Sequence, residues 1–132
     1  MEARALVTTD KQRFSIEDVV LPDPGPRQLL VQTLYSGVSI GTEFAVIQGK
    51  IDWGSFPLVT GYQGVGIVEA VGSDVTGFSV DQRVYYRANR EITSLDGQKI
   101  TGASGVHCSH AVVDVDGDHA CATLPDGADE EA

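Results

Sequence analysis

Short runs of alternating hydrophobic and polar residues dominate the chain, and this pattern is typical of β-strands. The runs that predict strands are 3–9, 14–22, 28–40, 67–72, 81–87, 106–115 and 119–125. Only residues 41–50, GTEFAVIQGK, predict a short helix, with Thr42 as its expected N-cap and Gly49 as its stop. The segments 51–60 and 90–105 are interpreted as loops, the second a long polar excursion. The sequence therefore predicts an all-β barrel or sandwich.

The most glycine-rich stretch is TGYQGVGIVEAVG, residues 60–72. Its glycines are spaced G-x-x-G-x-G, whereas dinucleotide-binding loops carry G-x-G-x-x-G between a strand and a helix. A strand is predicted to follow, so no helix N-terminus is available for a pyrophosphate. Gly61, Gly64 and Gly66 are instead expected to allow positive φ angles, tight bending or close approach of the backbone where a sheet curls into a barrel.

Length and charge narrow the class of protein. The 132 residues, 42% of them hydrophobic, fit one domain over 1–132. The net charge of −10 argues against nucleic acid as a partner. The chain has no run of about 20 apolar residues for a membrane span and no secretory pattern at its start. We expect a cytoplasmic protein without a membrane partner.

Four segments, in order, resemble the N-terminal GroES-like domain of the medium-chain dehydrogenases/reductases, the alcohol dehydrogenase superfamily. SGVSIGTEFAVIQG (36–49) resembles S-G-[IV]-C-G-T-D-x-H-x-x-x-G, with one extra residue before GT. Residues 56–84 resemble the segment P-x-x-x-G-H-E-x-x-G-x-V-x-x-V-G, which continues to G-D-R-V. GVHCSHAVVD (105–114) resembles G-x-[FH]-A-E-Y-V-V-V, and ATLPDGADEEA (122–132) resembles the LPD-x-x-x-x-E-E-A junction. The resemblance implies a mainly β fold, a GroES-like partly open β-barrel with short helices.

The departures from these motifs concern zinc. In zinc-dependent members, the Cys of C-G-T-D and the His of G-H-E bind the catalytic zinc, and the Glu of G-H-E lies beside it. The corresponding positions here are Ile40, Tyr62 and Gln63, which are poor zinc ligands. The cysteine-rich structural zinc lobe has no counterpart in 85–106, which contain no cysteine. We therefore expect no zinc, and the GTE and GYQ forms resemble a divergent branch that includes bacteriochlorophyllide-type dehydrogenases.

Three residues are candidates for catalysis by this resemblance. Thr42 matches the Ser/Thr that relays a proton from the substrate alcohol, although a helix N-cap explains it as well. Glu43 matches the following Asp, which more often orients its neighbours than reacts. Tyr62 replaces the metal-binding His, and its phenol is suited to donate a hydrogen bond or a proton to a carbonyl. Simple packing in the vacated site is an equal explanation for Tyr62.

Four further residues are expected to border the substrate. Ile40 and Gln63 stand at the altered metal positions, and His107 matches an aromatic or His that faces the cleft. Trp53 lies in the stretch that borders the substrate entrance, unless it only packs. Cys108 and His110 share one face of a predicted strand, but two ligands do not by themselves make a metal site. An unusual metal site that uses Glu43, Cys108 or His107 is an open alternative to the zinc-free prediction.

The resemblance implies the substrate-side catalytic domain of a zinc-independent NAD(P)-dependent oxidoreductase that reduces alcohol/carbonyl or enone substrates. Relatives bind the nicotinamide cofactor in a Rossmann domain, which residues 1–132 do not contain. We expect that domain as a partner in cis or as a separate chain, a small-molecule substrate, a possible homo-oligomer, and no turnover by this chain alone. The alternative is a stand-alone GroES-like binding or assembly module without enzyme activity.

Overall fold

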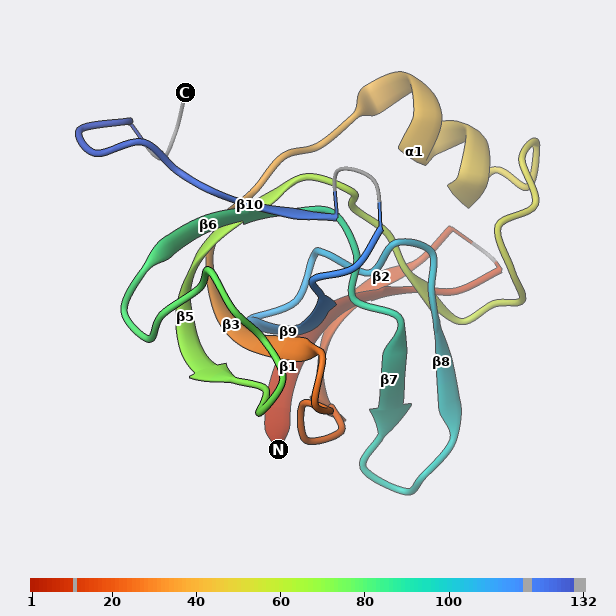
Figure 1. Cartoon of the computed structure of the whole chain (residues 1–132). Helices are drawn as coiled ribbons and strands as arrows, with labels where there is room; N and C mark the ends of the chain where they lie inside the picture. The colour runs from red at the N-terminus through yellow and green to blue at the C-terminus, as the bar shows by residue number, and fades with distance from the viewer. Residues whose placement is uncertain (11, 118–119, 130–132) are drawn as a thin grey trace.

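The computed structural model describes residues 1–10, 12–117 and 120–129, and these residues form mainly β-structure with one helix (Figure 1). The strands are β1 Glu2–Thr8, β2 Phe14–Val20, β3 Gln28–Ser36, β4 Leu58–Val59, β5 Gly64–Val71, β6 Arg83–Tyr86, β7 Glu91–Ser94, β8 Lys99–Gly102, β9 His110–Asp114 and β10 Cys121–Thr123. The helix is α1 Ile40–Ile47. The predicted mainly β, GroES-like barrel fold is confirmed.

Five strands close into a barrel in the order β1-β2-β7-β8-β4. The strands β1 and β2 form its longest antiparallel ladder, from the pair Glu2–Val20 to the pair Thr8–Phe14. The short β4 closes the barrel by pairing antiparallel with β1 and parallel with β8. Closure matters because it removes the unpaired edge that an open sheet would expose. The barrel core consists of small and branched side chains: Ala3, Ala5, Val7, Val19, Leu21, Val59, Ile92, Ile100, Cys108 and Val112.

The other five strands form a second sheet in the order β10-β6-β5-β3-β9. The alternation of hydrophobic and polar residues in 28–36 places Leu29 and Val31 in the core of this sheet, which also holds Tyr86. The register between β3 and β5 shifts twice, between Leu30 and Val31 and between Thr33 and Tyr35. Such irregularities bend a strand and re-aim its side chains. The second shift lies just before Ser36, the last residue of β3.

Gly61, Gly64 and Gly66, at and before the start of β5, allow close packing, as predicted. Gly61 has φ +95°, a conformation that L side chains rarely adopt. A Cβ atom on Gly66 would lie 2.3 Å from the backbone oxygen of Gln32, and one on Gly64 would lie 2.6 Å from the ring of Tyr86. These positions therefore exclude any side chain, and the glycines bring β3, β5 and β6 together.

Two segments interpreted as loops contain strands instead. Residues 90–105 form the hairpin of β7 and β8, which is part of the closed barrel, because Ile92 and Ile100 are buried in the core despite the polar composition around them. The segment 51–60 contains β4. The predicted strand 28–40 ends at Ser36, and the predicted strand 106–115 begins only at His110.

The helix also begins earlier than predicted. The N-cap of α1 is Ser39, so Thr42 is the third helical residue and not the cap. The helix lies outside the sheets (Figure 1) and buries Val46 against Leu58 of β4. This contact anchors the C-terminal turn of α1 to the barrel.

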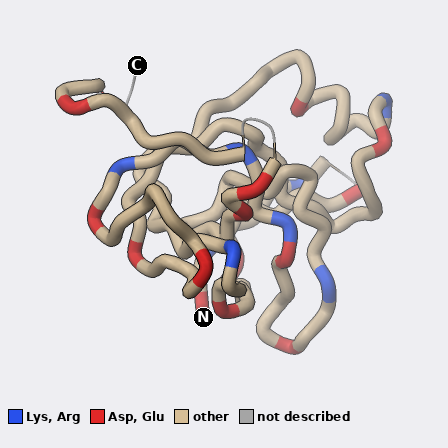
Figure 2. The backbone as a smooth tube through the Cα atoms, viewed as in Figure 1, with Lys and Arg blue, Asp and Glu red and all other residues tan. Residues whose placement is uncertain are grey.

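Acidic residues outnumber basic ones, 19 against 9, and Figure 2 shows them distributed along the loops and strand ends of the described chain. No helix in the described part of the chain is long and apolar enough to cross a membrane.

Candidate active site

The N-terminal turn of α1 places the carboxylate of Glu43 in a buried position. Glu43 is almost fully buried, and the backbone N–H of Ser39 donates to its Oε2 atom at 2.5 Å. The carboxylate therefore folds back onto the start of its own helix, where the helix dipole favours negative charge. Its second oxygen, Oε1, is left to face His107.

The ring of His107 is hydrogen-bonded at both nitrogens. Its Nε2 lies 2.6 Å from Oε1 of Glu43, and its Nδ1 lies 2.8 Å from Oγ of Ser36. The side chains of His107 and Glu43 are only 8% and 5% exposed, so water is largely excluded from the pair. The two side chains depend on each other, because removing either one would leave the other buried without its hydrogen-bond partner.

The backbone around His107 is fixed by hydrogen bonds to two other segments. Its N–H donates to the Thr60 carbonyl at 3.0 Å, and its own carbonyl accepts from the N–H of Leu6 at 2.9 Å. Gly61 provides the space for the ring, since a Cβ atom there would lie 2.9 Å from three ring atoms of His107. Thus the position of the imidazole depends on the glycine that precedes Tyr62.

The aromatic ring of Tyr62 lies between Trp53 and Arg87. The rings of Trp53 and Tyr62 meet edge to face with centroids 6.4 Å apart, and the Arg87 guanidinium lies 5.6 Å from the Tyr62 ring centroid. The Arg87 Nε also donates to the Tyr62 carbonyl at 3.3 Å. These contacts hold the phenol side chain of Tyr62 in a half-exposed position.

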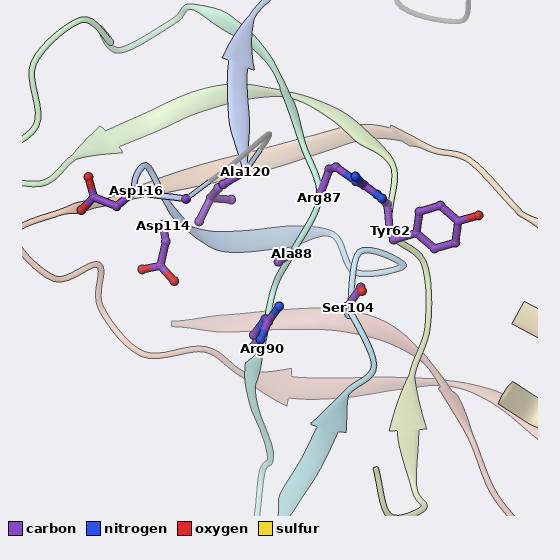
Figure 3. Close-up of a pocket in the computed structure, with 10 residues that line it drawn as sticks. Tyr62, Arg87, Ala88, Arg90, Ser104, Asp114, Asp116 and Ala120 are labelled. Atoms are coloured by element: carbon purple, nitrogen blue, oxygen red, sulfur yellow. The ribbon is translucent and has the colours of Figure 1, made fainter. Parts of the chain in front are cut away.

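A cavity of about 360 Å³ opens beside Tyr62 and Arg87 (Figure 3). Asp114 and Asp116 lie on its opposite side, and the ring of Tyr62 points away from them. Arg90 projects between these two sides (Figure 3), so the lining carries charges of both signs. Tyr62 thus borders this polar cavity with its backbone side while its ring contacts Trp53.

The structure brings together some of the predicted site residues and leaves others apart. Glu43 and His107 are in direct contact. Gln63 is exposed, and its carbonyl accepts from the N–H of Gly37 at 2.9 Å. Ile40 is 70% exposed at the start of α1, and Thr42, two residues further along, is half-buried. Ile40, Thr42 and Gln63 have no hydrogen bond to the Glu43–His107 pair among the described contacts.

The residues at the family's metal positions do not fit a zinc ion. An Ile side chain has no donor atom, and neutral Tyr and Gln are weak zinc ligands. Cys108 packs in the barrel core, and burial raises the pKa of its thiol, which disfavours the thiolate that a metal would need. Within residues 1–10, 12–117 and 120–129, no three His, Cys, Asp or Glu side chains converge into a metal site.

Sequence reasoning missed Ser36, Ser39 and Arg87. Ser36 and His107 are 71 positions apart, and no local pattern predicts their contact. The S-G pair that opens the segment 36–49 was the only available signal for Ser36. Arg87 is a cation at the end of a predicted strand, but its contact with Tyr62 depends on the pairing of β5 with β6, which the sequence does not reveal.

Comparison with known proteins identifies the family of the chain. The family described as "Alcohol dehydrogenase GroES-like domain" matches residues 25–126, and the chain belongs to this family. It is 36% identical over 80 residues to an alcohol dehydrogenase class-3 of Caenorhabditis elegans, covering 61% of this chain and 21% of that protein. It is 28% identical over 108 residues to the 2-desacetyl-2-hydroxyethyl bacteriochlorophyllide A dehydrogenase of Cereibacter sphaeroides, covering 80% and 34%.

Solved structures show the same fold. An alcohol dehydrogenase zinc-binding domain protein from Burkholderia ambifaria superposes with a TM-score of 0.82 at 18% identity, covering 99% of this chain and 44% of that chain. The chain thus spans less than half the length of this structure and about a third or less of the two sequence relatives.

Proposed function

We infer that this chain is the substrate-side catalytic domain of a zinc-independent NAD(P)-dependent oxidoreductase that acts on alcohol/carbonyl or enone substrates. Membership of the alcohol dehydrogenase GroES-like family supports the class of reaction. The observation that carries the zinc-independent part is the set Ile40, Tyr62 and Gln63 at the positions of the family's metal ligands and their neighbour. The nicotinamide cofactor, bound by a Rossmann domain in cis or on a separate chain, supplies the hydride.

Without a Lewis acid, a substrate carbonyl needs a hydrogen-bond donor at its oxygen atom. Tyr62 is the donor we propose, because its hydroxyl replaces the metal-binding imidazole and its ring is held between Trp53 and Arg87. Thr42, half-buried in α1, is the proposed second member of the proton path. Glu43 acts through His107, whose ring it orients by the hydrogen bond between its Oε1 and Nε2 of His107.

Selectivity is assigned to the more exposed neighbours. Ile40 and Trp53 present large apolar surfaces to solvent in this chain, and Gln63 is exposed beside Gly37. Such side chains are suited to contact an apolar substrate and to be covered when the cofactor domain is in place. His107 is the fourth residue that we propose to border the substrate, and its ring nitrogens are hydrogen-bonded to Ser36 and Glu43.

The test uses the complete polypeptide or complex that contains this chain and its Rossmann partner. We expect NAD(P)H-dependent reduction of aldehydes or enones that persists after dialysis against 1,10-phenanthroline. Tyr62→Phe should lower kcat by about 100-fold, while Tyr85→Phe, on the neighbouring strand β6, serves as the matched control. Loss of activity with the chelator and its return with zinc would contradict the proposal.

A further inference from the structure

Ser36, His107 and Glu43 form a continuous hydrogen-bonded chain of three side chains. The two links measure 2.8 Å from Ser36 Oγ to His107 Nδ1 and 2.6 Å from His107 Nε2 to Glu43 Oε1. A hydroxyl, an imidazole and a carboxylate joined in this order are the recurring parts of an activated serine, in which the carboxylate orients the base and the base accepts the hydroxyl proton. The proposed oxidoreductase function makes no use of Ser36.

The hydrogen bonds also determine which nitrogen of His107 carries the proton. The carboxylate of Glu43 only accepts hydrogen bonds, so it favours the tautomer with the proton on Nε2. The lone pair of Nδ1 then faces the Ser36 hydroxyl. The backbone N–H of Ser39 holds the other oxygen of Glu43 at 2.5 Å, so the carboxylate cannot rotate away without losing that bond.

The three side chains differ in their exposure to solvent, and a nucleophile needs its hydroxyl exposed and its base shielded. Ser36 is exposed at the end of β3, while the side chains of His107 and Glu43 are 8% and 5% exposed. The base is therefore shielded from water, and only the hydroxyl end of the chain faces solvent. A nucleophile in this position can meet a substrate without exposing its base.

Ser36 lies in an open groove of about 640 Å³ between β1, β2 and the end of β3. The groove walls are largely apolar: Ala5, Leu6, Ile16, Leu34 and Val38. Ile16 and Val38 are 60% and 70% exposed, which leaves their side chains free to contact an aliphatic chain. Arg4 also lines the groove, and its Nε lies 3.9 Å from the carboxylate of Asp18.

We propose that Ser36 is a base-activated nucleophile that accepts the acyl group of an uncharged aliphatic ester. Its Oγ attacks the ester carbonyl carbon while Nδ1 of His107 takes the hydroxyl proton, and Glu43 stabilises the imidazolium. The bond to the leaving alcohol oxygen then breaks, and that oxygen takes the proton from Nδ1. Water repeats the sequence on the acyl-Ser36 ester, releasing the acid and restoring the hydroxyl.

This activity is independent of the nicotinamide cofactor, so the 132-residue chain itself is the material for the test. The chain is incubated with p-nitrophenyl butyrate, nitrophenolate release is followed by absorbance, and the acylated residue is located by peptide mass spectrometry. We expect butyryl on Ser36 and release above the buffer rate. Ser36→Ala should abolish both, whereas Ser55→Ala, which removes another exposed hydroxyl, should leave them unchanged.

The relay is tested by Glu43→Gln against Glu69→Gln. Glu69 belongs to a second Glu–His pair of the described residues, with His110 at 3.6 Å, and this pair is more exposed. We expect Glu43→Gln to slow acylation by about 100-fold or more and Glu69→Gln to have no effect, with circular dichroism confirming that each variant is folded. If Glu43→Gln does not fold, the location of the acyl group on the wild-type chain decides. Butyryl found only on lysine or tyrosine, or equal rates for Ser36→Ala and wild type, would overturn the proposal.

Discussion

Replacing Glu43 by alanine is the most direct test of whether the buried Glu43–His107 pair holds the site together. The substitution removes the acceptor for two groups, Nε2 of His107 and the backbone N–H of Ser39. It leaves the rest of α1 unchanged, including the contact of Val46 with the barrel. The helix then keeps the packing of its C-terminal turn, but its N-terminal turn loses the contact with His107.

The expected loss follows from the two contacts. A hydrogen bond to a charged group contributes about 1.5–3 kcal/mol, and a buried donor left without an acceptor costs about 1–3 kcal/mol. We therefore expect Glu43→Ala to lower the free energy of unfolding by about 3–4 kcal/mol, which corresponds to a fall in Tm of about 10–15 °C for a chain of this length.

The assay is urea denaturation at 25 °C followed by tryptophan fluorescence and circular dichroism. Glu69→Ala is the matched control, because its pair with His110 is longer, at 3.6 Å, and more exposed, so about 0–1 kcal/mol is expected. Combining Glu43→Ala with His107→Ala should cost less than the sum of the single losses, because the two residues share one contact. Equal losses for Glu43→Ala and Glu69→Ala would refute the argument.

Two further predictions concern backbone space and pH. Gly61→Ala should lower the free energy of unfolding by at least about 2 kcal/mol more than Gly77→Ala. Both glycines have positive φ, but only at Gly61 would the new Cβ lie 2.9 Å from the His107 ring. Equal losses for the two variants in urea denaturation would rule this out. Burial raises the pKa of Cys121 to about 11 from its ordinary 9.0, so the unfolded chain loses this proton first and stability falls as pH rises from about 9 to 11. Cys121→Ala should make that fall shallower, and an unchanged slope would contradict the assignment.

The sequence predicts the strands that alternate cleanly and misses those that do not. In β3 the residues Leu29 and Val31 follow the period of two, and both are buried in the structure. The hairpin of β7 and β8 carries little apolar signal beyond Ile92 and Ile100, and its strands form because barrel closure supplies partners for them. This pairing depends on the closed barrel, so a short segment of the sequence does not predict it.

The same limit applies to the candidate site. The family motif points to Glu43 and His107 separately, but not to their contact. That contact needs the positive φ of Gly61, the N-cap of α1 at Ser39, and the end of β3 at Ser36. Each of these is set by packing between segments that are distant in the sequence.

Zinc content tests the central claim most directly. The protein is produced in zinc-supplemented medium, dialysed without chelator, and analysed by inductively coupled plasma mass spectrometry, both as this chain and with its Rossmann partner. Because Ile40, Tyr62 and Gln63 stand where a zinc-dependent relative carries Cys, His and Glu, the account predicts no stoichiometric zinc together with NAD(P)H-dependent turnover. Stoichiometric zinc that activity requires would contradict it.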